Sequence, residues 1–412
     1  MTKKIALAAL AVYGLASSAI ADSHPTVTIG GHFDTYWGYV SELTPPQGII
    51  TLLALDDSTR RDNALVNETK IIVRADGKLD NMYNIKYGGL IYLNADTSDD
   101  HYDDEYNAQQ TMAYFEGMFG RIEAGSYTGA SHALHVSATQ IARGHSGVDG
   151  GGIDSDWWKW INPEGDIAAI VVQHILVPQL YTNNIGIVGI TGVNATKITY
   201  FTPTYNGFQG GISYIPDIES FGTVDEAMGV FKYDTLAGGG LYKDILEGGV
   251  RYTGKYKDVG VKVALVGQLG DNKRFTNIDY HRLRAWEFGA AARYLNWVVA
   301  GAIADMQHSG QEDSALGTSN WYWNLGLAYE NGPFGISATY ATSKGQLNIA
   351  FGTGSTKSRV HTFGVGVDWQ VAKGMKLYAD LTTFSLKIPV PDNDPQAGNR
   401  GTVVRLGSLL SF

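Results

Sequence analysis

The chain of 412 residues contains no cysteine, so no disulfide bond can contribute to its stability. It also lacks any run of about 20 consecutive apolar residues, which excludes a helical inner-membrane protein. Basic residues are outnumbered, with 31 Lys and Arg against 41 Asp and Glu, and the formal net charge is -10. Because nucleic-acid binding needs a basic surface, we expect no nucleic-acid partner.

Glycine and tyrosine, in contrast, are abundant, with 51 and 24 residues, while charged residues make up only 17%. This composition is too polar for a bundle of membrane helices. It is typical of strands that expose apolar side chains at alternate positions and carry aromatic residues at the lipid interfaces. A chain of this length predicts one large barrel or two soluble domains.

The N-terminal residues have the layout of a cleaved secretory signal. Lys3 and Lys4 precede an apolar run at 5–15 and then small residues that end at Ala21. We therefore expect a signal peptide at 1–21, cleaved near Ala21, and a single exported domain at 22–412.

Alternation of apolar and polar residues is the main pattern of that domain. It is clear at 321–329, at 363–369 and at 402–412, where the chain ends on Phe412. Such runs recur about sixteen times, joined alternately by short turns and long polar loops. The first three are expected at 26–39, 70–76 and 82–93. The pattern predicts an all-β fold, a transmembrane antiparallel β-barrel of about 16 strands, although alternation also occurs in soluble sheets.

The expected barrel has consequences for function. Closed antiparallel pairing satisfies every backbone donor and acceptor without water, so such a chain can lie in lipid. Sixteen strands leave an aqueous channel, because side chains no longer fill a barrel of that diameter. The short turns are expected on the periplasmic side.

Several stretches resemble the Gram-negative trimeric porins, particularly the alphaproteobacterial branch. Residues 113–125 are similar to the hairpin before that family's constriction loop, and 198–203 with 207–214 to the hairpin after it. The terminal Phe412 matches the family's assembly signal. The resemblance implies a homotrimer of sixteen-stranded general diffusion channels in the bacterial outer membrane, each narrowed by an inward-folded third loop.

The segment 126–194 is the longest without alternation and occupies the position of that loop. Its candidate constriction acids are Asp149, Asp154, Asp156, Glu164 and Asp166. Cations at lumen-facing positions of the strands could form a basic wall opposite them: Lys70, Arg74, Lys86, Arg121 and Lys197. By the resemblance, the two sets create a transverse field that selects solutes. Alternatively, the acids cap turns or face solvent, and the cations only balance neighbouring carboxylates.

Two further clusters each allow two interpretations. Trp157, Trp158 and Trp160 could stack on sugars in a substrate-specific channel, or pack the long loop against the barrel. The acid-rich loop after the third strand could loosely bind calcium through Asp99, Asp100, Asp103 and Asp104, or be a solvated loop bridged by divalent cations to lipopolysaccharide phosphates. No other cofactor is expected.

The sequence therefore predicts an outer-membrane porin for passive diffusion of small hydrophilic solutes and ions. The acidic chain favours a mild preference for cations. Neither an HExxH nor a GxSxG motif occurs, so no enzymatic step is expected. The alternatives are a substrate-specific channel with a saturable site for a sugar or another small solute, and a plugged structural or adhesive barrel. A soluble two-domain binding protein is the remaining possibility.

Overall fold

The alternating runs form sixteen strands in the computed structural model. Described residues are 25–42, 61–79, 84–95, 108–145, 147, 157–160, 180, 194–218, 242–272, 279, 281–309, 311, 313, 319–347, 356–387 and 398–412. The strands are β1 (Thr26–Glu42), β2 (Asn63–Lys78), β3 (Lys86–Asn94), β4 (Ala108–Gly117), β5 (Gly120–Ser126), β6 (Thr196–Phe201), β7 (Phe208–Asp217), β8 (Tyr242–Tyr256), β9 (Val259–Asn272), β10 (Leu283–Tyr294), β11 (Trp297–Gln307), β12 (Asn320–Asn331), β13 (Phe334–Leu347), β14 (Thr356–Ala372), β15 (Met375–Lys387) and β16 (Gly398–Ser411). Three short helical segments lie between β5 and β6: α2 (Ala130–Leu134), η4 (Ala138–Ile141) and η5 (Trp157–Trp160).

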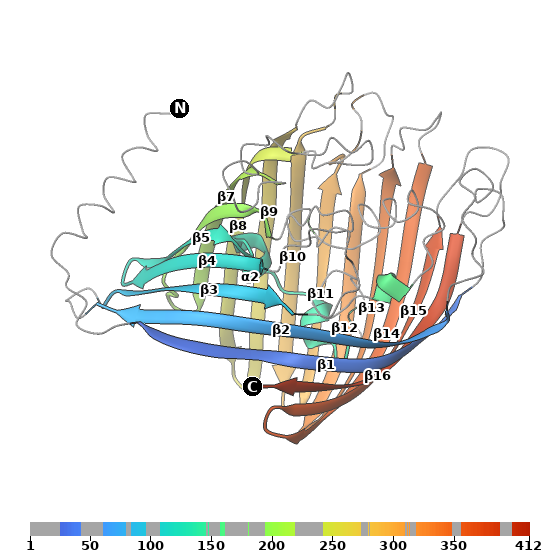
Figure 1. Cartoon of the computed structure of the whole chain (residues 1–412). Coiled ribbons are helices and arrows are strands. Elements are labelled where there is room, and N and C mark those ends of the chain that lie inside the picture. The colour runs from blue at the N-terminus through green and yellow to red at the C-terminus, as the bar shows by residue number, and fades with distance from the viewer. Residues whose placement is uncertain are drawn as a thin grey trace.

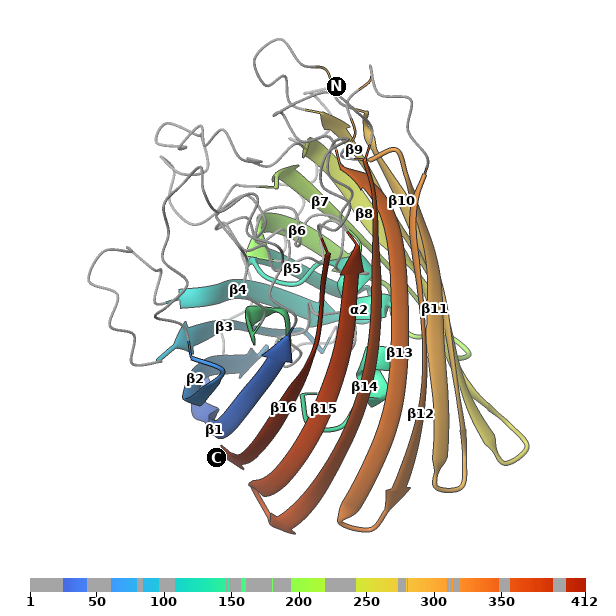
Figure 2. The same cartoon turned by 90° about the vertical axis from the view of Figure 1, so that its right-hand side faces the viewer.

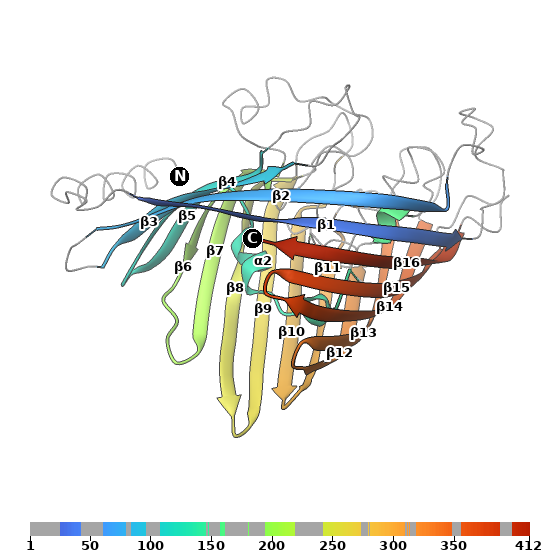
Figure 3. The ribbon, with the colours of Figure 1, turned by 60° about the horizontal axis from the view of Figure 1, so that its bottom comes forward.

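Each strand pairs antiparallel with its chain neighbours, and β1 pairs with β16, so the sheet closes into a barrel (Figure 1). At the closing seam Gly31 and Phe412 exchange two backbone hydrogen bonds of 3.2 and 3.1 Å. The Phe412 ring stacks on Phe33, with 5.4 Å between ring centroids. Figure 3 shows the end of β16 beside β1. The predicted all-β barrel of sixteen antiparallel strands is confirmed.

Alternate residues of each strand point to opposite faces of the barrel wall. On β1, Val27 and Ile29 are 62% and 67% exposed, whereas Asp34, Tyr36 and Val40 on the other face are buried. Large apolar side chains on the outer face have no protein neighbours to cover them, as expected where lipid does so. β1 therefore shows the alternation of apolar outer and inner positions that is expected of a barrel strand.

Short turns join the strands at one end of the barrel (Figures 1 and 2). At the β14–β15 turn Gly374 has a φ of +83°, and a Cβ there would lie 2.5 Å from the Ser411 carbonyl oxygen, so only glycine fits. Outward aromatic pairs lie near this end: Trp297 with Tyr329, and Phe334 with Trp369. No helix in the described part of the chain is long and apolar enough to cross a membrane.

Two expected strand boundaries are wrong. β2 begins at Asn63, earlier than the expected 70, because Asn63 still pairs with Tyr39 of β1. β3 begins at Lys86, later than the expected 82: Asn84 has a φ of +49°, which a strand residue does not adopt, and Leu79 N donates to Ile85 O across the wider turn. Residues 82 and 83 lie outside the described chain.

Candidate functional site

The connection between β5 and β6 lies inside the barrel, against its inner wall, in its described parts (Figure 2). Wall side chains accept hydrogen bonds from loop backbone N–H groups at four successive points. These are Ala130 N to Ser213 Oγ (2.8 Å), Ala138 N to Asn324 Oδ1 (2.9 Å), Arg143 N to Ser337 Oγ (2.8 Å) and His145 N to Asp380 Oδ2 (2.9 Å). The acceptors belong to β7, β12, β13 and β15, so the loop follows the wall round the lumen. The predicted inward fold of this loop is confirmed for these residues.

α2 is the first anchor of the loop. Its Ala130 and Leu134 are buried in an apolar cluster with Phe201, Val266 and Ala285 of the wall. Between them, Ser131 Oγ donates to Glu247 Oε2 over 2.6 Å. Apolar packing and a buried charge-assisted hydrogen bond therefore hold the same short helix.

His132 of α2 makes the stability of this anchor depend on pH. Its Nδ1 is buried and has no hydrogen-bond partner within the described chain. Burial, with smaller effects of the charges of His135 and Lys197, lowers the pKa of His132 to about 3. The ring is therefore neutral at pH 7.

Acidification should weaken this anchor. An unfolded histidine binds its proton near pH 6.5, whereas folded His132 binds it only near pH 3, so folding is disfavoured as the pH falls through this interval. Between pH 6.5 and 4.5 we expect a loss of up to about 2–3 kcal/mol in the free energy of unfolding, at about 1.4 kcal/mol per pH unit. Urea unfolding in lipid vesicles at both pH values measures it.

His132→Asn is the comparison variant, because other groups also titrate in this range. We expect the variant to lose less stability than the wild type between the two pH values. Equal losses in the two proteins would show that His132 contributes nothing to the pH dependence.

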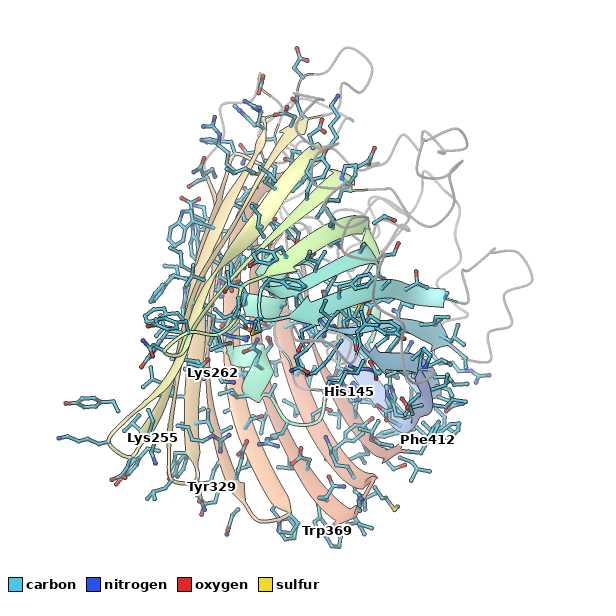
Figure 4. The ribbon with its side chains drawn as sticks, turned by 90° about the vertical axis from the view of Figure 1, so that its left-hand side faces the viewer. His145, Lys255, Lys262, Tyr329, Trp369 and Phe412 are labelled. Carbon is cyan, nitrogen blue, oxygen red and sulfur yellow. The ribbon has the colours of Figure 1, made fainter. Side chains whose placement is uncertain are left out.

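The second anchor is a buried polar network at the seam of the barrel. Arg405 of β16 is 0% exposed; its Nε donates to Asp380 Oδ1 (2.8 Å) and its Nη2 to the carbonyl of His145. The His145 ring Nε2 lies 2.7 Å from Asp34 Oδ2, and Tyr378 Oη donates to Asp34 Oδ1 over 2.7 Å. The loop is thus joined to β1, β15 and β16 together, in the region of His145 in Figure 4.

η5 is the third anchor. Trp157 is 2% exposed and stacks on Phe384 with 5.5 Å between ring centroids. Trp160 lies on Gly38, where a Cβ would come within 2.3 Å of its ring. Both side chains therefore pack the loop against the wall, which confirms this interpretation over a sugar-stacking surface for these two. The Trp158 side chain lies outside the described part.

The predicted basic residues all occupy lumen-facing positions, on β2, β3, β5 and β6. Three of them form ion pairs with carboxylates of the same wall: Arg74 Nε with Asp76 Oδ2 (2.7 Å), Lys86 Nζ with Glu116 Oε1 (3.3 Å), and Arg121 with Glu116 Oε2 (3.1 Å) and Glu123 Oε1 (2.6 Å). Arg121 also lies over the Tyr114 ring, 4.1 Å from its centroid. Their charges are thus balanced locally.

Lys70 and Lys197 are different, because both are buried. Lys70 Nζ donates to Asn94 Oδ1 over 2.5 Å, and Lys197 Nζ donates to the carbonyl of Tyr127 at the start of the loop. These two cations hold neighbouring segments together. The alternation of residues along a strand shows which face a side chain points to, but does not reveal this role.

The predicted acidic sets fall outside the described residues. This applies to Asp149, Asp154, Asp156, Glu164 and Asp166 of the loop and to Asp99, Asp100, Asp103 and Asp104 of the possible calcium site. Among the residues that are described, no group of three or more His, Asp or Glu side chains could hold a metal ion.

Sequence reasoning missed the groups that hold the loop: Asp34, His145, Asp380 and Arg405. It also missed Arg143, which forms ion pairs with Glu330 and Asp368. Inward parity could have placed Asp34, Asp380 and Arg405 in the lumen. The contacts of His145 with Asp380 and Arg405 join residues more than 200 positions apart, and no spacing along the chain indicates them.

Comparison with known proteins agrees with this geometry. A family model described as Gram-negative porin matches residues 6–388. An uncharacterized protein of Rickettsia bellii (strain RML369-C) is 24% identical over 341 residues, 73% of this chain and 75% of that protein. One of Rickettsia conorii (strain ATCC VR-613 / Malish 7) is 21% identical over 349 residues, 74% and 76% of the two chains.

Two solved structures share the fold. The anion-selective porin from Comamonas acidovorans has a TM-score of 0.56 at 16% identity, over 94% of this chain and 100% of that one. The trimer form of OmpT from Vibrio cholerae has a TM-score of 0.55 at 9% identity, over 95% and 100%. The family model covers nearly the whole chain and the closed barrel agrees with it, so this chain belongs to the Gram-negative porin family.

Proposed function

We propose that this porin forms a water-filled channel through which small hydrophilic solutes and ions diffuse passively across the outer membrane. The observation that carries this proposal is the exposure of charged side chains inside the barrel. Arg74 and Lys86 point into the lumen, yet their side chains are 47% and 52% exposed. A lumen packed by a plug would cover them, so this exposure favours an open interior over a plugged structural barrel.

We also propose the finer properties of the channel. Residues 1–21 are a cleaved signal peptide, the assembly is a homotrimer in contact with outer-membrane lipid and lipopolysaccharide, and a mild cation preference comes from the acidic loops. OmpT of Vibrio cholerae has a trimer form and the same fold, which supports the trimer. The formal charge of -10 supports the cation preference. Transport in this proposal involves no chemical step.

In this proposal the charged residues that line the narrowed lumen select the solutes. Arg74, Lys86 and Arg121 border the aqueous space on β2, β3 and β5, while Lys70 and Lys197 stabilise the wall behind them. The loop acids at 149, 154, 156, 164 and 166 are proposed to face them. Charged groups that line a pore act on permeating ions at short range.

Single-channel conductance in a planar bilayer tests the proposal. Detergent-purified protein should conduct in steps of three, and a KCl gradient should give a reversal potential on the cation-selective side. A barrel verified as folded that shows no conductance would contradict the channel. A reversal potential on the anion-selective side would contradict only the cation preference.

The double variant Arg74→Gln, Lys86→Gln should shift selectivity further towards cations. Removal of both cations leaves Asp76 in the lumen without this cationic partner, and leaves Glu116 with Arg121 as its remaining ion-pair partner. We expect the permeability ratio of K⁺ to Cl⁻ to rise about two- to tenfold. This rise corresponds to a change of about 0.4–1.4 kcal/mol in the electrostatic energy of the permeating ion at a partly screened site. The reversal potential measures it.

The matched control is Lys344→Gln, Arg359→Gln. These two residues pair with each other on β13 and β14 and point away from the lumen, so the same two charges are removed outside the channel. The control should leave the ratio unchanged. An unchanged ratio in the Arg74 and Lys86 variant would remove both residues from the proposed site.

A further inference from the structure

A second group of cations lies further round the barrel wall, on β8, β9 and β10, in the half of the lumen near the short turns. Lys262 of β9 faces Thr253 of β8 and Ala291 of β10 in the sheet register. The diagonal positions around it hold Arg251 and Lys255 on β8 and Arg293 on β10. We call these four residues the cation strip. Its other lumen-facing positions carry no charge: Gly249, Thr253, Gly260, Ala264, Gly289 and Ala291.

The positive charges of this strip are not neutralised by carboxylates to the extent that those of the β2–β5 wall are. Arg293 alone has an ion pair, with Glu330 (2.5 Å), among the described residues. Arg251 donates to the Ala133 carbonyl of α2 (2.9 Å) and to Gln209 Oε1 (3.2 Å), and both acceptors are neutral. Lys255 and Lys262 are exposed and have neither a hydrogen bond nor an ion pair with any described residue.

The nearest acids along the same strands are engaged elsewhere. Glu247 is buried and accepts from Ser131, and Glu287 is buried and accepts from Tyr322. Neither carboxylate is exposed to the aqueous lumen. The positive charge of the strip is therefore presented to the solute path.

The outer side of the barrel wall behind the strip is apolar and aromatic. Val261 and Val263, the neighbours of Lys262 along β9, point outward to the lipid side. Tyr252 and Tyr256 point outward beside Arg251 and Lys255, at the level expected for an interfacial aromatic belt. Figure 4 shows Lys262 and Lys255 following one another along the β8–β9 hairpin towards its turn. Any solute that crosses the channel passes this wall.

Diagonal like charges on one face of a sheet repel each other, so the strip costs stability unless an anion occupies it. A single oxyanion group can meet only part of a strip that spans three strands. We infer that the cation strip is a binding site for multivalent oxyanions, such as diphosphates, with the Thr253 hydroxyl as an additional donor between the cations. This inference rests on the proposed channel function and names a solute class that the channel would retain.

Pyrophosphate block of the channel tests the inference. Wild-type protein in 0.1 M KCl should lose conductance as potassium pyrophosphate is added, because a bound anion occupies the path. In Lys255→Gln, Lys262→Gln the concentration for half-block should rise at least about tenfold, the loss expected for two charge-assisted contacts. Sulfate should block more weakly than pyrophosphate, because it engages fewer of the cations.

Lys257→Gln is the matched control. Lys257 lies in the turn of the same hairpin, with its Nζ over the Tyr256 ring, outside the strip. It should leave the half-block concentration within about twofold of the wild type, because its ammonium lies over the outward-pointing Tyr256 ring and not in the lumen. An equal effect of the control, or a conducting wild type that pyrophosphate does not block, would overturn the site while the channel function stands.

Equilibrium titration calorimetry of pyrophosphate on the detergent-purified barrel gives an answer even if no conductance is found. Binding by the wild type that is abolished in Lys255→Gln, Lys262→Gln and kept in Lys257→Gln supports the strip. No binding by the folded wild type rejects it. Unchanged migration of the variants as folded barrels in gel electrophoresis excludes misfolding as the cause of weakened binding.

Discussion

Arg405→Met is expected to lower the free energy of unfolding by about 3–5 kcal/mol, the cost of removing one partner from a buried charge pair. Arg405 is 0% exposed, so without it Asp380 keeps its negative charge in a buried site. The His145 carbonyl also loses a donor. Urea unfolding in lipid vesicles measures the loss, and single-channel recordings should show larger current fluctuations because the loop is held less firmly.

Two further variants separate the possible causes of the stability loss in Arg405→Met. In Arg405→Met, Asp380→Asn the stranded charge is gone, and an amide oxygen at position 380 can still accept from His145 N. We expect this double variant to recover about 1–2 kcal/mol. Arg400→Met, an exposed position on the same strand, should change stability by less than about 0.5 kcal/mol. If Arg405→Met were as mild as Arg400→Met, the seam network would not hold the loop.

Trp157→Ala is expected to destabilise the protein by about 3–5 kcal/mol, the usual cost of removing a large buried aromatic side chain. Trp157 fills a cluster with Tyr36, Phe384 and Val403 between the loop and the closing strands. Without the indole ring in this cluster, η5 should leave the wall for part of the time. Urea unfolding measures the stability, and open-channel current noise reports the motion of the loop.

Trp297→Ala is the control of the same residue type. Trp297 is 50% exposed on the outer face of β11 and contacts Tyr329, so its removal affects the lipid interface and leaves the lumen unchanged. We expect ordinary open-channel noise in this variant. Quiet currents from Trp157→Ala together with wild-type stability would show that the cluster does not position the loop.

Features that repeat along each strand were predictable. Alternation along β1 or β12 follows from the two-residue period of a strand, and lipid on one side with water on the other makes that period visible in the sequence. The lumen-facing positions of Arg74 and Lys86 follow from the same parity. Turn positions were less certain: the late start of β3 depends on the left-handed conformation of Asn84.

Partners of the lumen-facing groups were not predictable. Parity places Lys70 and Lys197 on the inner face, but only the path of neighbouring segments shows that both are buried there. Arg143 meets Glu330 because the loop crosses β12 and β13 at that point. Such pairings depend on how the loop lies on the wall, and this arrangement leaves no periodic signal in the chain.

The sequence by itself therefore determined the class of the protein: a barrel of about sixteen antiparallel strands with its inner and outer faces, whereas the inward fold of the long loop was implied by the resemblance to porins. These features are local or periodic, and each strand repeats them. Tertiary structure alone decided which cations pair with carboxylates, such as Arg74 and Lys86, and which form no ion pair with the described residues, such as Lys255 and Lys262. The physical reason is that Coulomb interactions and hydrogen bonds depend on distances across the sheet and between loop and wall, which closure of the barrel sets.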